Sequence, residues 1–284
     1  MKIYLLKSFW GLVVLGILMQ INSSFAQYTP EQIFQKGYAA LEEGSYEDAV
    51  NYFTQFLASY PENVRAFNYR GLAYESLKNY PSALSDFSYA VQLSPHYIPA
   101  LLNRGNLYVL QENYDDALSD FSSVIMLDPS HIDGYLDRGS VYLKLEQPGP
   151  ALSDFNSALA IDPNNSEAYR KRAEAYLQMH DDKDALSDFD KAIELDSNNE
   201  LAYYDRGSYF YSHNEIRKAL EDFNNVIQLN PECFEAYYKR GHILYELDSY
   251  ELAKSDFNRA IELHQEYKKE LNSLLNKINK KIEK

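Results

Sequence analysis

A pattern that recurs every 34 residues constrains the fold of this chain more than any other feature. Three landmarks share this step: an Arg followed by Gly or Ala, an Ala, and a Phe. The Arg landmarks are Arg70, Arg104, Arg138, Arg172, Arg206 and Arg240, and the Phe landmarks are Phe87, Phe121, Phe155, Phe189, Phe223 and Phe257. An earlier copy carries Gly37, Ala49 and Phe53 in the same register. Such a period predicts a solenoid, in which each unit buries its apolar face against its neighbours.

Each period predicts two helices joined by a turn. Apolar residues recur at i, i+3, i+4 and i+7, which is the spacing of an amphipathic helix. The small residue after each Arg and the recurring Ala let the two helices of a unit approach closely. A Pro near the end of most units cannot continue a helix and sets the turn to the next unit. These residues are Pro61, Pro95, Pro129, Pro163 and Pro231.

The order of the landmarks resembles the tetratricopeptide repeat (TPR) family, whose repeats carry a small residue, a large one, an Ala, an aromatic residue and a Pro at fixed places. The chain departs from the pattern at Ser197 and Gln265, for example, which stand where the Pro is expected. The resemblance implies an all-α, right-handed superhelical TPR solenoid of helix-turn-helix repeats. It places seven repeats at residues 30–63, 64–97, 98–131, 132–165, 166–199, 200–233 and 234–267.

Residues 268–284 are expected to form a C-terminal capping helix. Leu271, Leu275 and Ile278 share one face of this helix, and Lys residues cover much of the rest. A solenoid needs such a cap, apolar on its inner side and polar on its outer side. The Lys-rich side would alternatively suit an acidic membrane surface.

The first 26 residues have the pattern of a secretory signal peptide. Lys2 and Lys7 precede an apolar run at residues 9–19, and Ser24-Phe25-Ala26 offers a cleavage site after Ala26. The run is shorter than the roughly 20 residues that span a bilayer, which favours cleavage over an uncleaved anchor helix. We therefore expect an exported protein, periplasmic or secreted and associated with the cell envelope, with no integral membrane segment after cleavage.

The charge balance argues against nucleic acid as a partner. The chain has 27 basic and 42 acidic residues, a net charge of −15. A phosphate-binding surface needs clustered Lys and Arg, and the body of the chain has no such cluster. The single cysteine, Cys233, excludes an intramolecular disulfide. We interpret it as a small apolar residue near a repeat boundary rather than as a reactive thiol.

The sequence contains no pattern that predicts catalysis. The six His residues are scattered, without the spacing of a metal site. Neither a Gly-rich phosphate loop nor a nucleophile elbow occurs. The predicted repeats and cap occupy the whole chain after the signal peptide. The prediction is a protein that is not an enzyme and uses no cofactor or metal.

An acidic residue recurs in register with each Arg landmark. The first repeat lacks both members, with Lys36 and Tyr52 in their places. This joint loss suggests that the two residues contact each other, and a guanidinium matches a carboxylate in bidentate geometry. We therefore predict structural ion pairs, with a row of ligand-binding Arg residues as the alternative. The acidic partners are Asp86, Asp120, Asp154, Asp188, Asp222 and Asp256.

The resemblance to TPR proteins also implies a binding surface, because their first helices line a concave groove. Carried over to this chain, the groove includes Tyr38, Tyr69, Asn103, Asn106, Asp137, Arg170, Lys171, Tyr204, Asp205, Tyr238 and Lys239. Tyr side chains offer large contact areas at low entropic cost, which suits an extended peptide. The predicted function is thus a scaffold or adaptor that binds a protein or peptide. If the Tyr rings stack on sugars, the protein is instead a glycan-binding or small-ligand-binding module; alternatively, some of these Tyr only pack between helices.

Overall fold

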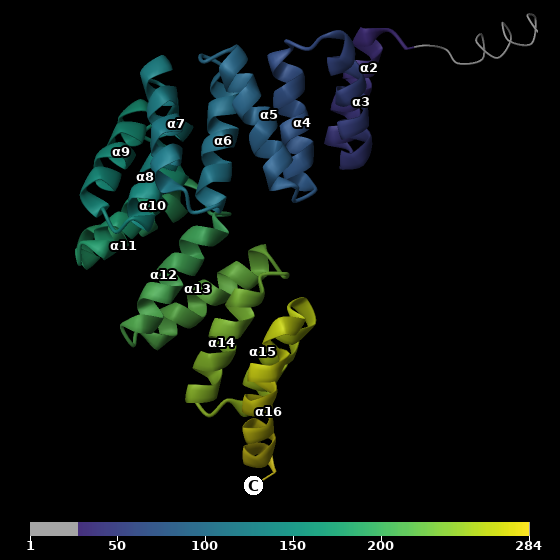
Figure 1. Ribbon diagram of the computed structural model, residues 1–284. Coiled ribbons are helices and arrows are strands. Elements are labelled where there is room, and N and C mark those ends of the chain that lie inside the picture. Colours follow the sequence, from purple (N-terminus) through teal and green to yellow (C-terminus); the bar gives the residue numbers. More distant parts are fainter. Residues whose placement is uncertain (1–27, 284) are drawn as a thin grey trace, which may run out of the picture. The chain divides into compact units, whose positions relative to one another are not determined.

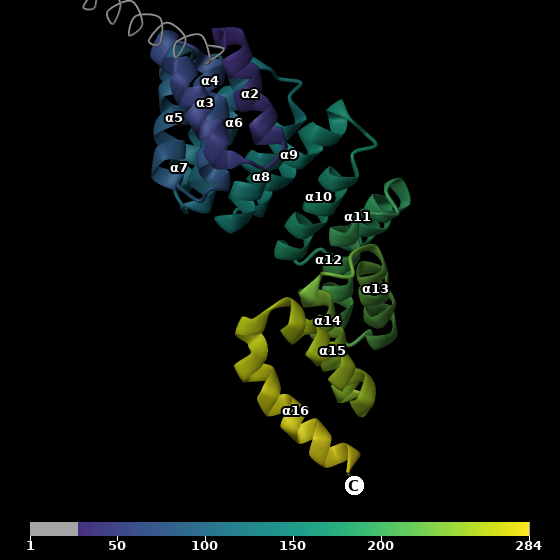
Figure 2. The same ribbon diagram turned by 90° about the vertical axis from the view of Figure 1, so that its right-hand side faces the viewer.

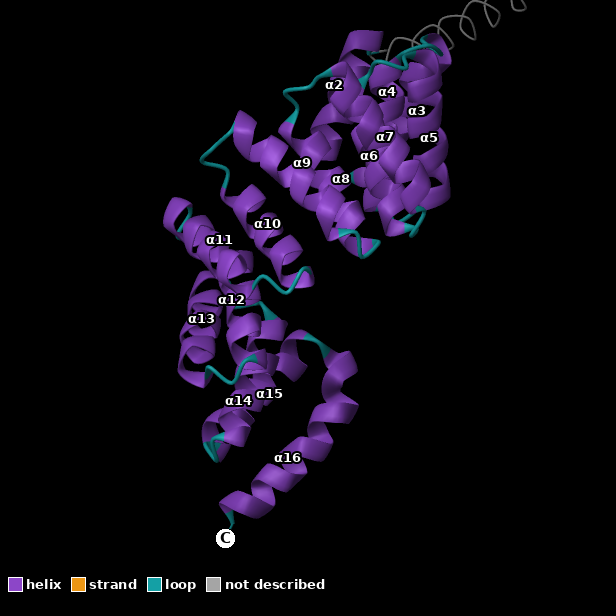
Figure 3. Ribbon diagram, turned by 90° about the vertical axis from the view of Figure 1, so that its left-hand side faces the viewer, coloured by secondary structure: helices purple, strands orange, loops and turns teal. Residues whose placement is uncertain are grey.

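The computed structural model describes residues 28–283, so the predicted signal peptide lies outside the described part of the chain. Residues 28–283 form fifteen α-helices and one short 3-10 helix, with no strand. Figure 3 shows these helices and the short loops that join them. The predicted all-α fold is confirmed. None of the helices in this range is long and apolar enough to cross a lipid bilayer.

Two kinds of helix alternate along the chain (Figure 1), and we name them A helices and B helices. A helices have 13 residues and B helices 14. The A helices are α2 (Pro30–Glu42), α4 (Val64–Ser76), α6 (Ile98–Leu110), α8 (Ile132–Lys144), α10 (Ser166–Gln178), α12 (Glu200–Ser212) and α14 (Phe234–Glu246). The B helices are α3 (Tyr46–Ser59), α5 (Tyr80–Leu93), α7 (Tyr114–Leu127), α9 (Pro148–Ile161), α11 (Asp182–Leu195), α13 (Ile216–Leu229) and α15 (Tyr250–Leu263). The 3-10 helix η1 (Gln265–Tyr267) and α16 (Lys268–Ile282) follow.

Local sequence explains where several A helices begin. The side chains of Asn63, Asn165 and Asn199 each accept a hydrogen bond from the backbone N–H three residues later, at 2.9, 2.8 and 3.0 Å. These bonds satisfy donors that the first turn of a helix leaves unpaired. Pro148 begins α9, at a position that has no need of a backbone N–H.

After some of the Arg landmarks, an aromatic ring of the same hairpin leaves no room for a Cβ. A Cβ added to Gly71 would lie 2.5 Å from the ring of Phe87, and one added to Gly139 would lie 2.6 Å from the ring of Phe155. Both rings are fully buried, so they have little room to move away. The sequence analysis expected a small residue at this position, and the structure identifies the Phe landmark as the side chain that it accommodates.

A left-handed backbone conformation recurs in the turns between A and B helices. Gly44 has a φ of 76° in the first turn, and non-glycine residues take this conformation in six later turns, with φ between 56° and 60°. In the turn after α8, the N–H of the next residue, Gln147, donates to the Tyr142 carbonyl at 2.8 Å, as in a Schellman motif. These non-glycine residues are Lys78, Glu112, Glu146, His180, Asn214 and Asp248. A Cβ in this conformation costs about 1–2 kcal/mol.

Replacing Glu146 by Gly is therefore expected to stabilise the protein. Glu146 is exposed, with a φ of 56°. Gly relieves the strain of the Cβ but adds backbone entropy to the unfolded chain, so we expect a net gain of about 0.5–1 kcal/mol in the free energy of unfolding. Urea denaturation followed by circular dichroism measures it. Glu146→Ala is the control, because it removes the same side chain and keeps the Cβ; an equal gain from Ala would contradict the explanation.

The chain divides into two compact units, Met1–Leu107 and Tyr108–Lys284, with the boundary inside α6. In the first unit, Phe53 and Phe56 of α3 pack with Ile33 of α2. A second cluster joins Phe87 of α5 to Leu107 of α6. Each hairpin thus buries its apolar face against its neighbours, as the period predicts.

The second unit repeats this packing through α9, α11, α13 and α15, with one fully buried Phe in the middle of each helix. The unit ends in α16, which follows α14 and α15 in Figure 2. Leu271, Leu275 and Ile278 of α16 pack with Phe257 of α15. These contacts give α16 the buried face that a capping helix requires.

Candidate partner-binding surface

A buried ionic network occupies the A helices of the second unit. Arg170 of α10 is only 7% exposed. Its guanidinium contacts Glu167 at 2.7 Å and Asp205 of α12 at 2.6 Å, and it also bonds Glu174. One Arg therefore binds three carboxylates from two A helices and fixes their side chains. We call the surface formed by α8, α10 and α12 around this network the A-helix face.

Burial and Arg170 shift the pKa values of the carboxyl groups in this network in opposite directions. Burial raises the pKa of Glu174 and of Asp205 above the ordinary value, although Arg170 opposes the shift. For Glu167, burial also favours the neutral form, but the hydrogen bond and charge of Arg170 outweigh it and lower the pKa. The network contains more carboxylates than guanidinium groups and remains acidic.

Lys171 connects the network to α8. Its ammonium donates to the Ser140 hydroxyl at 2.9 Å and lies 3.5 Å from Glu167. Asp137 of α8 lies near this Lys. Burial raises the pKa of the Asp137 carboxyl to about 6, although the positive charge of Lys171 lowers it. Three of the predicted groove residues (Arg170, Lys171 and Asp205) thus share one network, with Asp137 beside it.

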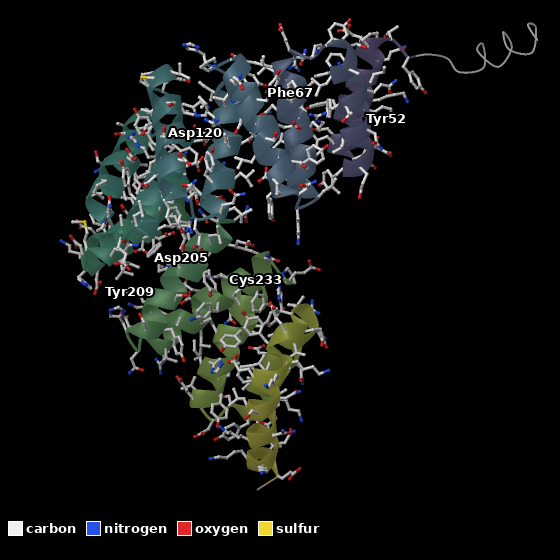
Figure 4. The ribbon with its side chains drawn as sticks, viewed as in Figure 1. Tyr52, Phe67, Asp120, Asp205, Tyr209 and Cys233 are labelled. Atoms are coloured by element: carbon white, nitrogen blue, oxygen red, sulfur yellow. The ribbon has the colours of Figure 1, made fainter. Side chains whose placement is uncertain are left out.

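Two adjoining cavities open on the A-helix face. One, of about 350 Å³ between α8 and α10, is lined by Lys144, Lys171 and Gln178 among others. The other, of about 490 Å³ between α10 and α12, is lined by Asp205, Ser208 and Tyr209, two of which Figure 4 labels. Glu174 borders both cavities. The first cavity is mainly basic at its rim and the second acidic.

The predicted groove tyrosines of the second unit are largely used in packing. Tyr204 meets Phe223 edge-on, with ring centroids 5.8 Å apart. Tyr238 donates to Glu270 of α16 at 2.7 Å, and this hydrogen bond is the main cause that raises its pKa to about 12. The neighbouring Lys239 is half-buried. Tyr204 and Tyr238 are both half-buried, with these contacts inside their own unit.

The A helices of the first unit carry an aromatic cluster at the corresponding positions. Tyr69 of α4 packs edge-on against Tyr38 at 5.3 Å and against Phe34 at 6.0 Å. The Arg65 guanidinium lies 5.8 Å from the Tyr69 ring centre. Tyr38 is 37% exposed and is the most open of the predicted groove tyrosines.

Two predicted groove residues of the first unit lie on α6. Asn103 donates to the Asn68 side chain of α4 at 2.9 Å, so it bridges two A helices. Asn106 is exposed. The two Asn residues therefore differ in role: one holds neighbouring repeats together, and the other remains open to solvent.

The Arg landmarks bind the recurring Asp residues in bidentate geometry. In the pair of Arg206 and Asp222, Nε and Nη2 donate at 2.9 and 2.7 Å to the two carboxylate oxygens. The Asp side chain is 2% exposed and the Arg 18%. The same geometry joins Arg70 to Asp86, Arg138 to Asp154, Arg172 to Asp188 and Arg240 to Asp256. Of the remaining predicted pair, Arg104 lies in the first unit and Asp120 in the second.

Each of these Arg residues also has a partner in the preceding B helix, which the sequence analysis missed. Arg206 Nη1 donates to Asp190 at 2.5 Å, sixteen residues earlier. The other acceptors are Thr54, Ser122, Asn156 and Asn224. A signal was present, because the residue after each Phe landmark is always Thr, Ser, Asn or Asp. Each guanidinium thus ties two repeats together, which supports a structural role over a row of ligand-binding Arg.

In the first repeat, aromatic rings replace the carboxylate. The Lys36 ammonium lies 4.2 Å from the ring centre of Tyr28 and 5.7 Å from that of Tyr52. Figure 4 labels Tyr52 and also Phe67, over which the Arg70 guanidinium lies at 5.4 Å. In the first unit, cation–π contacts therefore occur beside the Arg–Asp pairs.

The part of the chain that the structure describes contains no group of His, Cys, Asp and Glu side chains able to hold a metal ion. The His residues that line the cavity between α10 and α12, His180 and His213, are exposed. The site offers hydrogen bonds, charge and apolar contacts, which are the chemistry of binding.

Comparison with known proteins identifies the repeats. Models of the tetratricopeptide repeat match residues 34–98, 105–170, 166–199, 207–248 and 234–267. No curated protein matches the sequence.

Solved structures share the fold at low sequence identity. A tetratricopeptide repeat protein from Parabacteroides merdae is 21% identical, with a TM-score of 0.72, over 88% of this chain and 98% of that one. MamA from Desulfovibrio magneticus is 21% identical, with a TM-score of 0.55, over 60% of this chain and 96% of that one. A chain of the APC/C hetero-tetramer Cut9–Hcn1 is 14% identical, with a TM-score of 0.68, and this chain spans 50% of its length. The repeat matches and the helical hairpins together show that this is a tetratricopeptide-repeat protein.

Proposed function

We propose that this protein is an exported scaffold that binds a segment of a partner protein across the A-helix face of its second unit. The observation that carries the proposal is the pair of adjoining cavities between α8, α10 and α12, which share Glu174. A peptide laid across three A helices would contact both cavities. TPR proteins act in general as protein-interaction scaffolds, which supports the same class of function.

The ionic network prepares this surface for binding. Arg170 binds Glu174 of its own helix and Asp205 of α12, and Lys171 donates to Ser140 of α8. These bonds hold the side chains in place. Side chains that are already ordered lose little entropy when a partner binds. The change from a basic rim to an acidic rim also gives a bound segment a preferred direction.

The observed use of the tyrosines favours a protein partner over a glycan. Tyr69, Tyr204 and Tyr238 contact side chains of their own unit. Stacking on a sugar needs an open ring face, and Tyr38 alone among the four predicted groove tyrosines is exposed. No observation therefore favours a second function.

The binding surface can be tested by capture from a cell-envelope extract with three baits. These are the unchanged protein, Lys144→Glu with Gln178→Glu at the cavity rim, and Lys183→Glu with Ser187→Glu on α11. All four residues are exposed, and both double variants change the net charge equally. We expect one protein to be retained by the unchanged bait and the α11 variant and lost from the rim variant. Equal retention by all three baits would place binding on another surface.

The export part of the proposal rests on the predicted signal peptide and has its own test. We expect the protein isolated from the periplasmic or secreted fraction to begin at Gln27, as measured by intact mass and N-terminal sequencing. A cytoplasmic protein that keeps residues 1–26 would contradict export without affecting the proposed binding surface.

A further inference from the structure

A third cavity of the second unit has a different chemistry from the A-helix face. It encloses about 540 Å³ where the N-terminal ends of α12 and α14 meet the C-terminal end of α13. Its apolar lining includes Leu201, Tyr204, Val226 and Phe234. Cys233, labelled in Figure 4, also borders it. Leu201 is 48% exposed, so an apolar surface remains open to solvent at this place.

The cavity is also lined by the His264 imidazole, which contacts Glu266 at 2.9 Å, and by three carboxylates; no Lys or Arg lines it. The three carboxylates belong to Glu200, Glu232 and Glu235. Glu200 accepts a hydrogen bond from Asn230 at 3.3 Å, and Glu235 accepts one from the Cys233 thiol at 3.6 Å. Neither donor carries a charge. Arg259 donates to the Pro231 carbonyl near this turn, but Glu262 binds it at 3.1 Å.

The negative charge of this rim is therefore not compensated by the protein. None of the three carboxylates forms an ion pair with another residue in the described range 28–283. This differs from the A-helix face, where Arg170 binds three carboxylates. Uncompensated charge beside open apolar surface attracts a partner of the opposite charge that also buries an apolar group.

We propose that this cavity binds a partner segment in which an apolar side chain is flanked by Lys or Arg. The apolar side chain fills the space between Leu201, Val226 and Phe234, and the cations meet the three Glu carboxylates. This inference rests on the proposed function, because it names the chemistry of the partner. Tyr204 borders both this cavity and the one between α10 and α12, so one segment can occupy both. The net charge of −15 would also steer a basic segment toward the protein.

The binding test uses the full chain and a short fluorescein-labelled peptide in which Lys alternates with Leu and Phe. Two control peptides replace Lys by Glu, or Leu and Phe by Ser. Fluorescence anisotropy should show binding of the first peptide alone, weakened by added salt because the rim carboxylates are exposed to solvent. Equal binding of the Ser peptide would show that charge alone drives the association and would overturn the proposal.

Paired variants locate the site. Glu232→Lys with Glu235→Lys should weaken binding by about tenfold or more, because like charges then face each other. The matched control is Glu221→Lys with Glu251→Lys, which makes the same change in net charge at exposed positions of α13 and α15. Leu201→Gln should also weaken binding, and Leu252→Gln, at a Leu that is 61% exposed, should not. Equal effects within each pair would overturn the proposal.

Cys233 supplies an independent check, since it is the one cysteine of the chain. Alkylation with N-ethylmaleimide adds bulk at the cavity without a charge and should abolish peptide binding. In the variant Cys233→Ser, the same treatment should leave the affinity at whatever value that variant had before treatment, because no thiol remains to be alkylated. If the alkylated protein still binds the peptide, the peptide lies elsewhere and the proposal fails.

The outcomes separate this inference from the proposed function. If the rim variant at Lys144 and Gln178 loses its captured partner while the basic peptide fails to bind, the proposed function stands and this inference falls. If the peptide binds at the cavity but the captured proteins are the same for the unchanged bait and the rim variant, this inference stands and the proposed binding at the A-helix face falls. Sedimentation experiments test whether a second copy of the chain occupies the cavity. Self-association that is lost both in Lys280→Glu with Lys281→Glu and in Glu232→Lys with Glu235→Lys would show this and would overturn the proposal.

Discussion

Replacing Asp222 by Ala is expected to lower the free energy of unfolding by about 3–5 kcal/mol, because the change leaves a half-buried guanidinium without its main partner. The Asp222 side chain is 2% exposed, and it accepts two hydrogen bonds from Arg206. Burial raises the pKa of Asp222 even against the hydrogen bonds from Arg206. Urea denaturation followed by circular dichroism, at a pH above neutrality, measures the loss.

Arg206 also provides the control for this experiment, because it binds a second carboxylate that is exposed. Asp190 contacts the same guanidinium at 2.5 Å, but its side chain is 65% exposed. Water screens such a pair, so Asp190→Asn should cost less than about 1 kcal/mol. If the two variants lose similar amounts of unfolding free energy, the burial of an ion pair does not determine how much the pair stabilises the fold. Replacing both Arg206 and Asp222 by apolar residues should cost less than removing Asp222 alone, because no charge then remains buried.

The second large effect is expected at Asp137 of α8, whose carboxyl burial brings to a pKa of about 6 from an ordinary value of 3.8. Between these two values the folded chain binds more protons at this site than the unfolded chain, so stability falls as the pH rises through this window. Above pH 6 the charged carboxylate destabilises the fold by up to about 3 kcal/mol. Asp137→Asn removes the charge, so we expect this variant to gain up to that amount near neutral pH.

Denaturation of the variant and the unchanged protein from about pH 4 to pH 8 tests this explanation. Other carboxylates of the network also titrate, so the informative quantity is the difference between the two curves. That difference should grow between pH 4 and pH 6 and then level off. Asp133→Asn, at an exposed position one turn earlier on α8, is the control and should show no such growth. A loss of stability in Asp137→Asn at neutral pH would mean that the charged form is required, as a partner of Lys171.

The gain expected from Asp137→Asn also bears on binding. Asp137 lies beside the proposed binding surface, and functional sites commonly keep residues that lower stability. Capture of a partner by Asp137→Asn should then be weaker than capture by the unchanged protein, even though the variant is more stable. A variant that is more stable and binds equally well would remove Asp137 from the binding surface.

Most of the fold could be predicted from the sequence because its determinants repeat. The period, the Arg and Asp landmarks and the Phe landmark each occur in several copies, and a signal that recurs in register stands out from chance. The all-α class follows from it, and so does the pairing of Arg70, Arg138, Arg172, Arg206 and Arg240 with the Asp sixteen residues later. The division into seven repeats and the signal peptide stay predictions.

The candidate site could be predicted only in outline, because it lies at the positions that vary between repeats. The predicted groove residues include Arg170, Asp205 and Lys171, which the structure joins in one network, but they also include Tyr204 and Tyr238, which the structure uses for packing. A variable position has no repeated signal, and its role depends on the side chain one repeat away.

The sequence by itself determined the local conformation: where helices begin and end, which face of each is apolar, and which charges recur. It did so because helix periodicity, capping and turns depend on residues only a few places apart. Only the tertiary structure decided which side chains remain open, where the cavities lie, and that the Glu200, Glu232 and Glu235 carboxylates have no cation among the described residues. These properties arise where neighbouring hairpins meet, from side chains that differ between repeats, and positions that vary leave no periodic trace in a single sequence.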